Sequence, residues 1–155
     1  MKISVKINKN KLSNSLKLNT GTIIVRFQKV THHGSGMLAT ELAKELITGY
    51  SDKFGNKVIS IPPRPLFKEY ATENKDNIKN IVKSSYALRF KKIKAEEQFN
   101  IASKLIAGNL AQWIIEGHVA PANSRYTQKI KGFNAPFYST GELVSLLEGV
   151  YVHKS

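Results

Sequence analysis

The sequence has no cysteine among its 155 residues, and it is short of acidic side chains, with 11 Asp and Glu against 24 Lys and Arg. The lack of cysteine excludes disulfide frameworks, cysteine-ligated zinc sites and thiol nucleophiles. A membrane helix needs about 20 apolar residues, and the most apolar stretch, residues 105–115, is interrupted by Asn109 and Gln112. The N-terminal residues alternate polar and apolar side chains, unlike a signal peptide. We therefore expect a soluble protein made inside the cell, with no membrane partner.

The remaining composition is that of one folded domain. A chain of 155 residues suits a single domain, since domains commonly have roughly 100–200 residues. Hydrophobic residues make up 41% of the chain, too large a share for a disordered protein. No internal repeat or low-complexity linker divides the sequence. We predict a single domain over residues 1–155.

The positive charge is concentrated, and it allows two interpretations. The formal net charge is +13, and residues 75–94 hold seven basic side chains against Asp76 alone. One interpretation is a nucleic-acid-binding module, whose affinity would fall steeply with salt. The other is a solvated basic face that keeps the protein soluble or docks on an acidic protein surface. No RNA-recognition signature, zinc finger or glycine-rich phosphate loop favours nucleic acid. The candidate residues of the basic surface are Lys83, Arg89, Lys91, Lys92 and Lys94.

Period-two alternation and β-branched residues predict the strands. Residues 3–7 alternate in the manner of a half-buried strand. Residues 22–30 form the strongest strand pattern in the chain, because they are rich in β-branched side chains and place Ile23, Val25 and Phe27 on one face. Shorter strands are expected at residues 58–61 and 150–152.

Apolar side chains at helical spacing predict the helices. The strongest pattern covers residues 96–117, where an apolar stripe ends at Trp113, and such stripes are usually buried. Gly108 in this helix is expected to allow a close approach to a second helix. Further helices are expected at residues 37–49, 76–93 and 139–147. Residues 51–57 and 118–136 are expected to be loops, with one helical turn at 126–130. Together these elements predict an α+β fold in which a small mixed or antiparallel sheet packs with two or three helices, plus extended loops or arms for contacts between subunits.

The sequence offers no strong catalytic or metal-binding motif. His32 and His33 could in principle meet Glu41 and Glu45, which share a helix face, but a solvated acidic face beside a loop explains these residues better. The members of a Ser–His–acid triad can come from anywhere in a chain, yet no Gly-x-Ser-x-Gly motif is present, and residues 33–36 are only a shortened version of it. We predict no enzymatic activity, no metal and no cofactor.

Residues 61–67 form a proline-rich connection between a strand and a helix. Pro63 and Pro65 fix their own φ at about −65° and bias the preceding residues toward extended geometry. We expect a stiff arm that reaches a partner, although the prolines could simply stiffen a loop. The residues that this arm would present are Arg64, Leu66 and Phe67.

A second unusual stretch runs from Pro121 to Val152. It contains, in order, Pro-Ala-Asn-Ser, Lys-Gly, Ala-Pro-Phe-Tyr-Ser and Thr-Gly-Glu-Leu before the final strand. Together with the Pro-Pro-Arg-Pro segment and the two helices between them, this order resembles the tail-completion proteins of tailed bacteriophages, also called head–tail connector or neck proteins. The resemblance covers about residues 58–152. The chain departs from the family pattern at Leu66, where Phe is usual, at Phe137, where Leu is usual, and at Glu142, where a basic residue is frequent.

The resemblance implies a structural protein of the virion. Members of this family form a ring, usually six-fold, at the head–tail junction, where they complete the tail or join it to the head and let genomic DNA pass through the central channel. The implied partners are other copies of the chain, the adjacent connector or head-completion proteins, the tail-terminator or tail-tube proteins and, transiently, DNA. Assembly would take place in the host cytoplasm. The alternative remains a basic nucleic-acid-binding module that uses residues 75–94.

Two segments supply the residues expected at interfaces with other subunits. Rigid segments lose less entropy on association, which suits proline-braced arms to this purpose. The expected interface residues are Pro63, Arg64, Pro65, Leu66, Phe67, Asn123, Ser124, Thr127, Lys131, Phe137, Thr140, Gly141 and Leu143.

Overall fold

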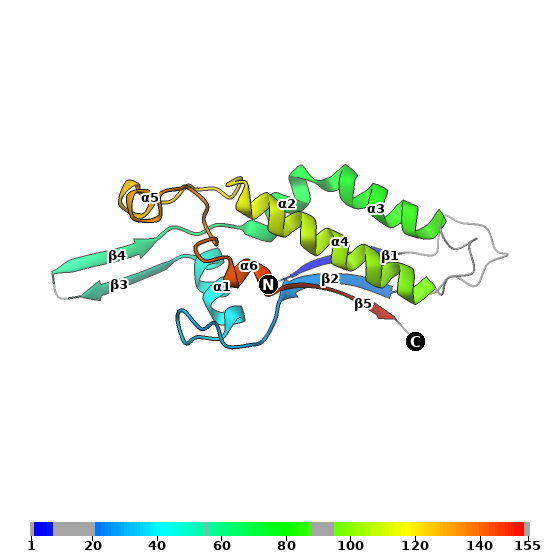
Figure 1. Cartoon of the computed structure of the whole chain (residues 1–155), viewed down its shortest axis with the longest axis horizontal. Coiled ribbons are helices and arrows are strands. Elements are labelled where there is room, and N and C mark those ends of the chain that lie inside the picture. The colour runs from blue at the N-terminus through cyan, green and yellow to red at the C-terminus, as the bar shows by residue number, and fades with distance from the viewer. Residues whose placement is uncertain (1, 8–20, 55, 88–94, 154–155) are drawn as a thin grey trace.

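The computed structural model describes residues 2–7, 21–54, 56–87 and 95–153 of the chain (Figure 1). Its strands are β1 (Ile3–Ile7), β2 (Gly21–Phe27), β3 (Tyr50–Phe54), β4 (Lys57–Ile61) and β5 (Leu147–His153). Its helices are α1 (Ala39–Thr48), α2 (Leu66–Glu73), α3 (Lys75–Ala87), α4 (Ala95–Ile115), α5 (Arg125–Lys131) and α6 (Glu142–Ser145). The fold is α+β, as the sequence predicts.

The three-stranded sheet has the order β1–β2–β5, and all its pairings are antiparallel. The predicted inward face of the central strand is confirmed, since Ile23, Val25 and Phe27 are all buried. In the register of β2 with β5, Ile23 lies opposite Tyr151 and Val25 opposite Gly149. The sheet thus joins the N-terminal half of the chain to its last strand.

Helix α4 lies along the sheet and forms the centre of the core (Figure 1). The stripe expected to be buried is buried throughout, from Phe99 through Ile106 and Leu110 to Trp113. Burial of such a stripe is the main source of stability for a helix in a protein. No helix in the described ranges is long and apolar enough to cross a membrane.

Helix α4 comes very close to β5 at Gly149. A Cβ atom built on Gly149 would overlap the main-chain carbonyl of Ser103 and lie 2.8 Å from the nitrogen of Lys104. Glycine on the strand and a small, buried serine on the helix therefore let the two backbones touch. The prediction for Gly108 is wrong, because a Cβ there meets no described atom within 4 Å. The close approach is made to the sheet, at Ser103, and not to a second helix.

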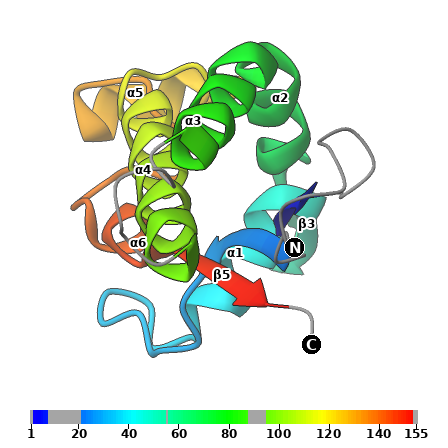
Figure 2. The same cartoon turned by 90° about the vertical axis from the view of Figure 1, so that its right-hand side faces the viewer.

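Helices α2 and α3 complete the core beside α4 (Figure 2). The ring of Tyr70 in α2 packs edge-on against Trp113, with centroids 5.8 Å apart. The indole nitrogen of Trp113 donates to Glu73 at 3.0 Å. Sequence patterns did not separate α2 from its neighbour, because α2 is only eight residues long and follows directly on the prolines.

Strands β3 and β4 form a two-stranded antiparallel hairpin that projects from the body at the end opposite the C-terminus (Figure 1). The prediction of a polar loop at residues 51–57 is wrong for residues 51–54 and for Lys57, which lie in strands. Pairing with β4, from Tyr50 opposite Ile61 to Phe54 opposite Lys57, imposes strand geometry on Asp52 and Lys53, residue types that are usually depleted in strands.

Candidate functional site

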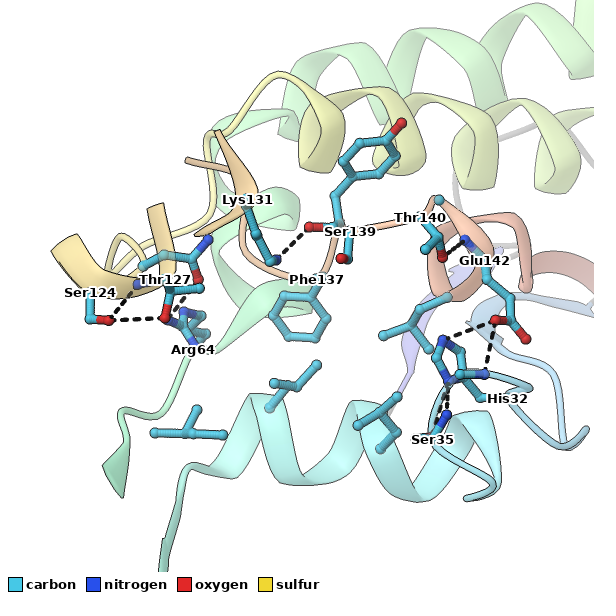
Figure 3. Close-up of a pocket in the computed structure, with 18 of the residues that line it drawn as sticks. His32, Ser35, Arg64, Ser124, Thr127, Lys131, Phe137, Ser139, Thr140 and Glu142 are labelled. Atoms are coloured by element: carbon cyan, nitrogen blue, oxygen red, sulfur yellow. Dashed lines mark hydrogen bonds and ion pairs between the residues drawn. The ribbon is translucent and has the colours of Figure 1, made fainter. Parts of the chain in front are cut away.

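A cavity of about 510 Å³ lies where α1, the end of β4, α5 and residues 137–143 meet (Figure 3). Both segments singled out in the sequence reach it, although Arg64 and Pro121 are 57 positions apart. The expected interface residues that line it are Arg64, Asn123, Ser124, Thr127, Lys131, Phe137, Thr140, Gly141 and Leu143. Pro63, Pro65, Leu66 and Phe67 do not line it.

Arg64 ties the proline-rich segment to the connection between α4 and α5. Its Nε donates to the carbonyl oxygen of Pro121 at 2.8 Å, and its Nη2 makes longer contacts with Ala122 O and Asn123 Oδ1, at 3.4 and 3.5 Å. Its backbone nitrogen donates to Ile47 O at 3.0 Å. Burial lowers the pKa of Arg64, a residue that is only 4% exposed.

The expectation that this segment presents Leu66 and Phe67 to a partner is wrong, whereas Arg64 lines the cavity. Leu66 and Phe67 open α2 and face the core, and the ring of Phe67 packs against Phe27 with centroids 6.0 Å apart. The prolines precede an amphipathic helix whose apolar side chains turn inward. Pro63 and Pro65 remain exposed.

Helix α5 carries Lys131, the second cation of the cavity, and has a capping residue at each end. Ser124 caps its start by accepting from the nitrogen of Thr127 at 3.2 Å, and Gly132 ends it with a positive φ of 77°. The Nζ of Lys131 donates to Tyr138 O at 2.6 Å. Burial lowers the pKa of Lys131, and the positive charge of Arg64 lowers it further.

Three side chains in contact, joined by one hydrogen bond and one ion-pair contact, occupy the opposite end of the cavity (Figure 3). Ser35 Oγ lies 3.0 Å from His32 Nδ1, and His32 Nε2 lies 3.4 Å from Glu142 Oε2. The carboxylate of Glu142 also accepts the backbone N–H groups of His33 and Gly34, at 2.5 and 3.3 Å. These donors hold the pKa of Glu142 below its ordinary value, with His33 contributing most.

This order of serine, histidine and carboxylate is also that of a nucleophile with its general base, but the contacts favour a structural role. The nitrogen of Ser35 donates to the same His32 Nδ1 that would have to accept the serine proton, at 3.1 Å. Ser35 Oγ in turn lies 3.3 Å from the nitrogen of Met37, which donates to it. All three side chains thus close the loop at residues 32–37 on itself or on α6. We interpret the set His32, Ser35 and Glu142 as a latch, and we call it the loop latch below.

Sequence reasoning did not identify the acid that contacts this histidine pair. It considered Glu41 and Glu45, whereas the structure brings Glu142 to His32 from more than 100 positions away. No local pattern marks such a contact. Within the described residues, no group of three or more His, Cys, Asp and Glu side chains forms a metal site.

Phe137 separates the two polar ends of the cavity (Figure 3). Its ring stacks on Phe27, with centroids 6.5 Å apart and planes 10° from parallel. Its φ is +65°, a left-handed conformation that costs an ordinary residue about 1–2 kcal/mol. Burial of the ring holds the backbone in this conformation, and the segment 135–141 is therefore fixed in shape.

Uncovered apolar side chains gather on α5 and the hairpin. No residue of α5 is buried, and Tyr126 and Ile130 on it are 75% and 68% exposed. Val58 and Tyr50 on the hairpin are also exposed. Figure 1 places α5 and the hairpin at the same end of the molecule. We call this region the hairpin end.

The expected basic surface is described only in part. Lys83 is exposed on α3, together with Lys75 and Lys79, while Ile78 on the same helix is buried. Lys79 pairs with Asp76 at 3.0 Å. Arg89, Lys91, Lys92 and Lys94 lie outside the described residues.

Comparison of the chain with models of known protein families, with curated proteins and with solved structures finds no match.

Proposed function

We propose that this chain is a structural subunit of a tailed-phage particle, in which several copies form a ring at the head–tail junction. The observation that carries the proposal is the hairpin end, where a projecting pair of strands and an unburied helix stand beside the cavity lined by the expected interface residues. The sequence resemblance to tail-completion proteins is the reason for placing this ring at the head–tail junction. The free strand edges and exposed apolar side chains of the hairpin end favour assembly with another subunit.

The hairpin is poorly supported by its own chain. A two-stranded hairpin is marginally stable by itself in water. Among the described strands, β3 pairs only with β4, so each keeps one free edge. A free strand edge offers unpaired N–H and C=O groups to another chain. In the proposed ring, a neighbouring subunit covers this hairpin.

The side chains of helix α5 also favour a hairpin end that a neighbouring subunit covers. A short helix with no buried residue gains no stability from its own core. Tyr126 and Ile130 are large and apolar, and tyrosine is enriched in protein interfaces. In the proposed ring, the hairpin end of one subunit contacts the body of the next, so the two contacting surfaces differ. Such head-to-tail contacts close into a ring when the rotation between neighbouring subunits allows it.

The test is to delete the gene from the phage that carries it and to examine the lysate by electron microscopy. We expect filled heads and separate tails, and expression of the wild-type chain in trans should restore joined particles. Normal infectious particles after deletion would rule out the proposed role. A stop codon placed in a gene that is dispensable for assembly serves as the matched control.

A nucleic-acid-binding module is the second candidate, because α3 exposes Lys75, Lys79 and Lys83 on the face away from its buried side. This candidate predicts DNA affinity that falls steeply with the logarithm of the salt concentration. It also predicts loss of binding when Lys83, Lys91, Lys92 and Lys94 are replaced by Glu. Undetectable DNA binding at low salt would eliminate it.

A further inference from the structure

One end of the cavity collects positive charge that no described acid neutralises. Arg64 and Lys131 both line it, and neither takes part in an ion pair within the described ranges. Among the described residues that line the cavity, Glu142 is the one carboxylate, and it is held at the other end by the loop latch. Buried charge without a partner is costly in a protein interior.

The cations at this end keep unused hydrogen-bond donors. A guanidinium has five N–H donors, and Arg64 uses those on Nε and Nη2, while Nη1 donates to no acceptor in the described part of the chain. The ammonium group of Lys131 has three donors and gives one to Tyr138 O. Asn123 Nδ2, beside Arg64, is buried and also lacks an acceptor.

The electrostatics agree with this geometry. Burial lowers the pKa of Arg64 and is also the main cause of the lowered pKa of Lys131, to which Arg64 adds. For neither group does an acid oppose the effect. An anion placed between the two would favour both charged forms.

A carboxylate fits these donors and the walls around them. The planar fork of an arginine matches the two oxygens of a carboxylate. The hydroxyl residues Ser124 and Thr127 line the same end (Figure 3), and the apolar Leu42 and Ile61 also line the cavity. The volume of about 510 Å³ is within the range of roughly 300–1,000 Å³ that ligand cavities commonly have.

We infer that this end of the cavity binds a carboxylate, and that the carboxylate belongs to an Asp or Glu which a partner protein carries on an otherwise apolar segment. The net charge of +13 favours an acidic partner. Nucleic acid fits less well, because Arg64 is 96% buried and a phosphodiester would have to bring its sugars past apolar walls to reach it. The inference rests on the cavity alone and does not depend on the proposed place in a phage particle.

The test is an NMR titration of the ¹⁵N-labelled wild-type chain at fixed ionic strength. The probe is the acetylated and amidated tripeptide Leu-Glu-Leu, and the matched control is Leu-Gln-Leu. We expect the Glu peptide to give saturable shifts of the Arg64 Nε–H signal, and the Gln peptide to bind roughly tenfold more weakly, since hydrogen bonds to charged groups are the stronger ones. Equal binding of the two peptides would overturn the inference.

A second arm separates protein carboxylates from nucleic-acid phosphates. Sodium acetate and dimethyl phosphate are titrated under the same conditions, and acetate should bind more tightly at Arg64. Tighter binding of dimethyl phosphate would overturn the inference in favour of a nucleic-acid contact.

Two lysine variants on α5 locate the effect. Lys131→Met removes the cation inside the cavity, whereas Lys129→Met removes an exposed one on the same helix. Binding of the Glu peptide should weaken roughly tenfold in the first and stay unchanged in the second. Equal weakening in both would show a general charge effect and contradict a specific site. If Lys131→Met fails to fold, the wild-type titration still decides.

Discussion

Replacing Gly149 by Ala should destabilise the protein strongly, because the new methyl group would meet backbone and not a movable side chain. The added Cβ would overlap the carbonyl of Ser103 and lie 2.8 Å from the nitrogen of Lys104. To make room, α4 has to lift from β5, and the apolar contacts around Ile106 and Phe99 would loosen. Overpacking a core costs about 1–3 kcal/mol, and a clash with backbone belongs at the upper end.

The magnitude can be checked by thermal unfolding followed by circular dichroism. For a chain of this size, each kcal/mol shifts the melting temperature by roughly 2–4 °C. A loss of about 3 kcal/mol therefore predicts a fall of roughly 6–12 °C. Denaturant titration of the same variant should move the midpoint and leave the slope unchanged.

Gly108→Ala is the matched control, because it is the same substitution on the helix that Gly149 touches. A Cβ at Gly108 meets no described atom within 4 Å, and the position is exposed. Alanine in the interior of a helix is favoured over glycine by about 0.5–1 kcal/mol, so this variant should be slightly more stable than wild type. If Gly149→Ala melts within about 1 °C of wild type, a shift well below the one expected from the clash, the packing of α4 on β5 described above is wrong.

Three further predictions concern the loop latch and the hairpin end. Because the pKa of Glu142 is lowered in the folded chain, its ionised form stabilises the fold at pH values above the ordinary pKa of 4.5, and this contribution disappears as the pH falls through the lowered pKa. Thermal melts should therefore show Glu142→Gln to be less stable than wild type at pH 7. The difference in melting temperature should close in acid. A difference that stays constant into strong acid would contradict the loop latch. A fluorophosphonate probe should leave the wild-type chain unlabelled, whereas labelling that is abolished in Ser35→Ala would identify a reactive serine. Ile130→Asp should melt like wild type, since exposed substitutions usually change stability by less than about 0.5 kcal/mol, yet it should fail to enter particles. The control Ile101→Asp, at another exposed apolar position, should enter them. Incorporation of both variants would argue against the hairpin end as an interface.

The core of this fold could be predicted from the sequence because its pattern is periodic. Alternation identified the buried face of β2, and the three-to-four spacing from Phe99 to Trp113 identified the buried face of α4. In both elements the side chains of these predicted faces are apolar and buried, and hydrophobic periodicity is the most reliable local signal of structure. The α+β class follows from those elements.

Local sequence patterns could not predict the structure of segments whose conformation depends on contacts with other segments. Strand β3 forms because β4 pairs with it, although Asp52 and Lys53 are poor strand formers. Arg64 is turned inward by carbonyl oxygens 57 and 58 positions away, so its charge suggested exposure where the structure has burial. The proline-rich segment was correctly recognised as unusual, but it positions the buried Arg64, which donates hydrogen bonds to the carbonyl oxygens of Pro121 and Ala122.

The candidate site was found in part for the same reason. Motif order grouped residues 61–67 with residues 121–143, and the cavity brings nine members of that set together. The contact of Glu142 with His32 has no counterpart in local sequence, because the loop and α6 meet only in the folded chain. Nothing local indicated that Lys131 and Arg64 would be near enough for the charge of one to lower the pKa of the other.

The most direct measurement of the central proposal is a cryo-electron microscopy reconstruction of the head–tail junction in the tailed phage that, on this proposal, encodes the chain. We expect a closed ring of identical copies in which the β3–β4 hairpin and α5 of each copy are covered by a neighbouring subunit. A junction fully accounted for by other proteins, or a ring in which the hairpin and α5 face open solvent, would contradict the account.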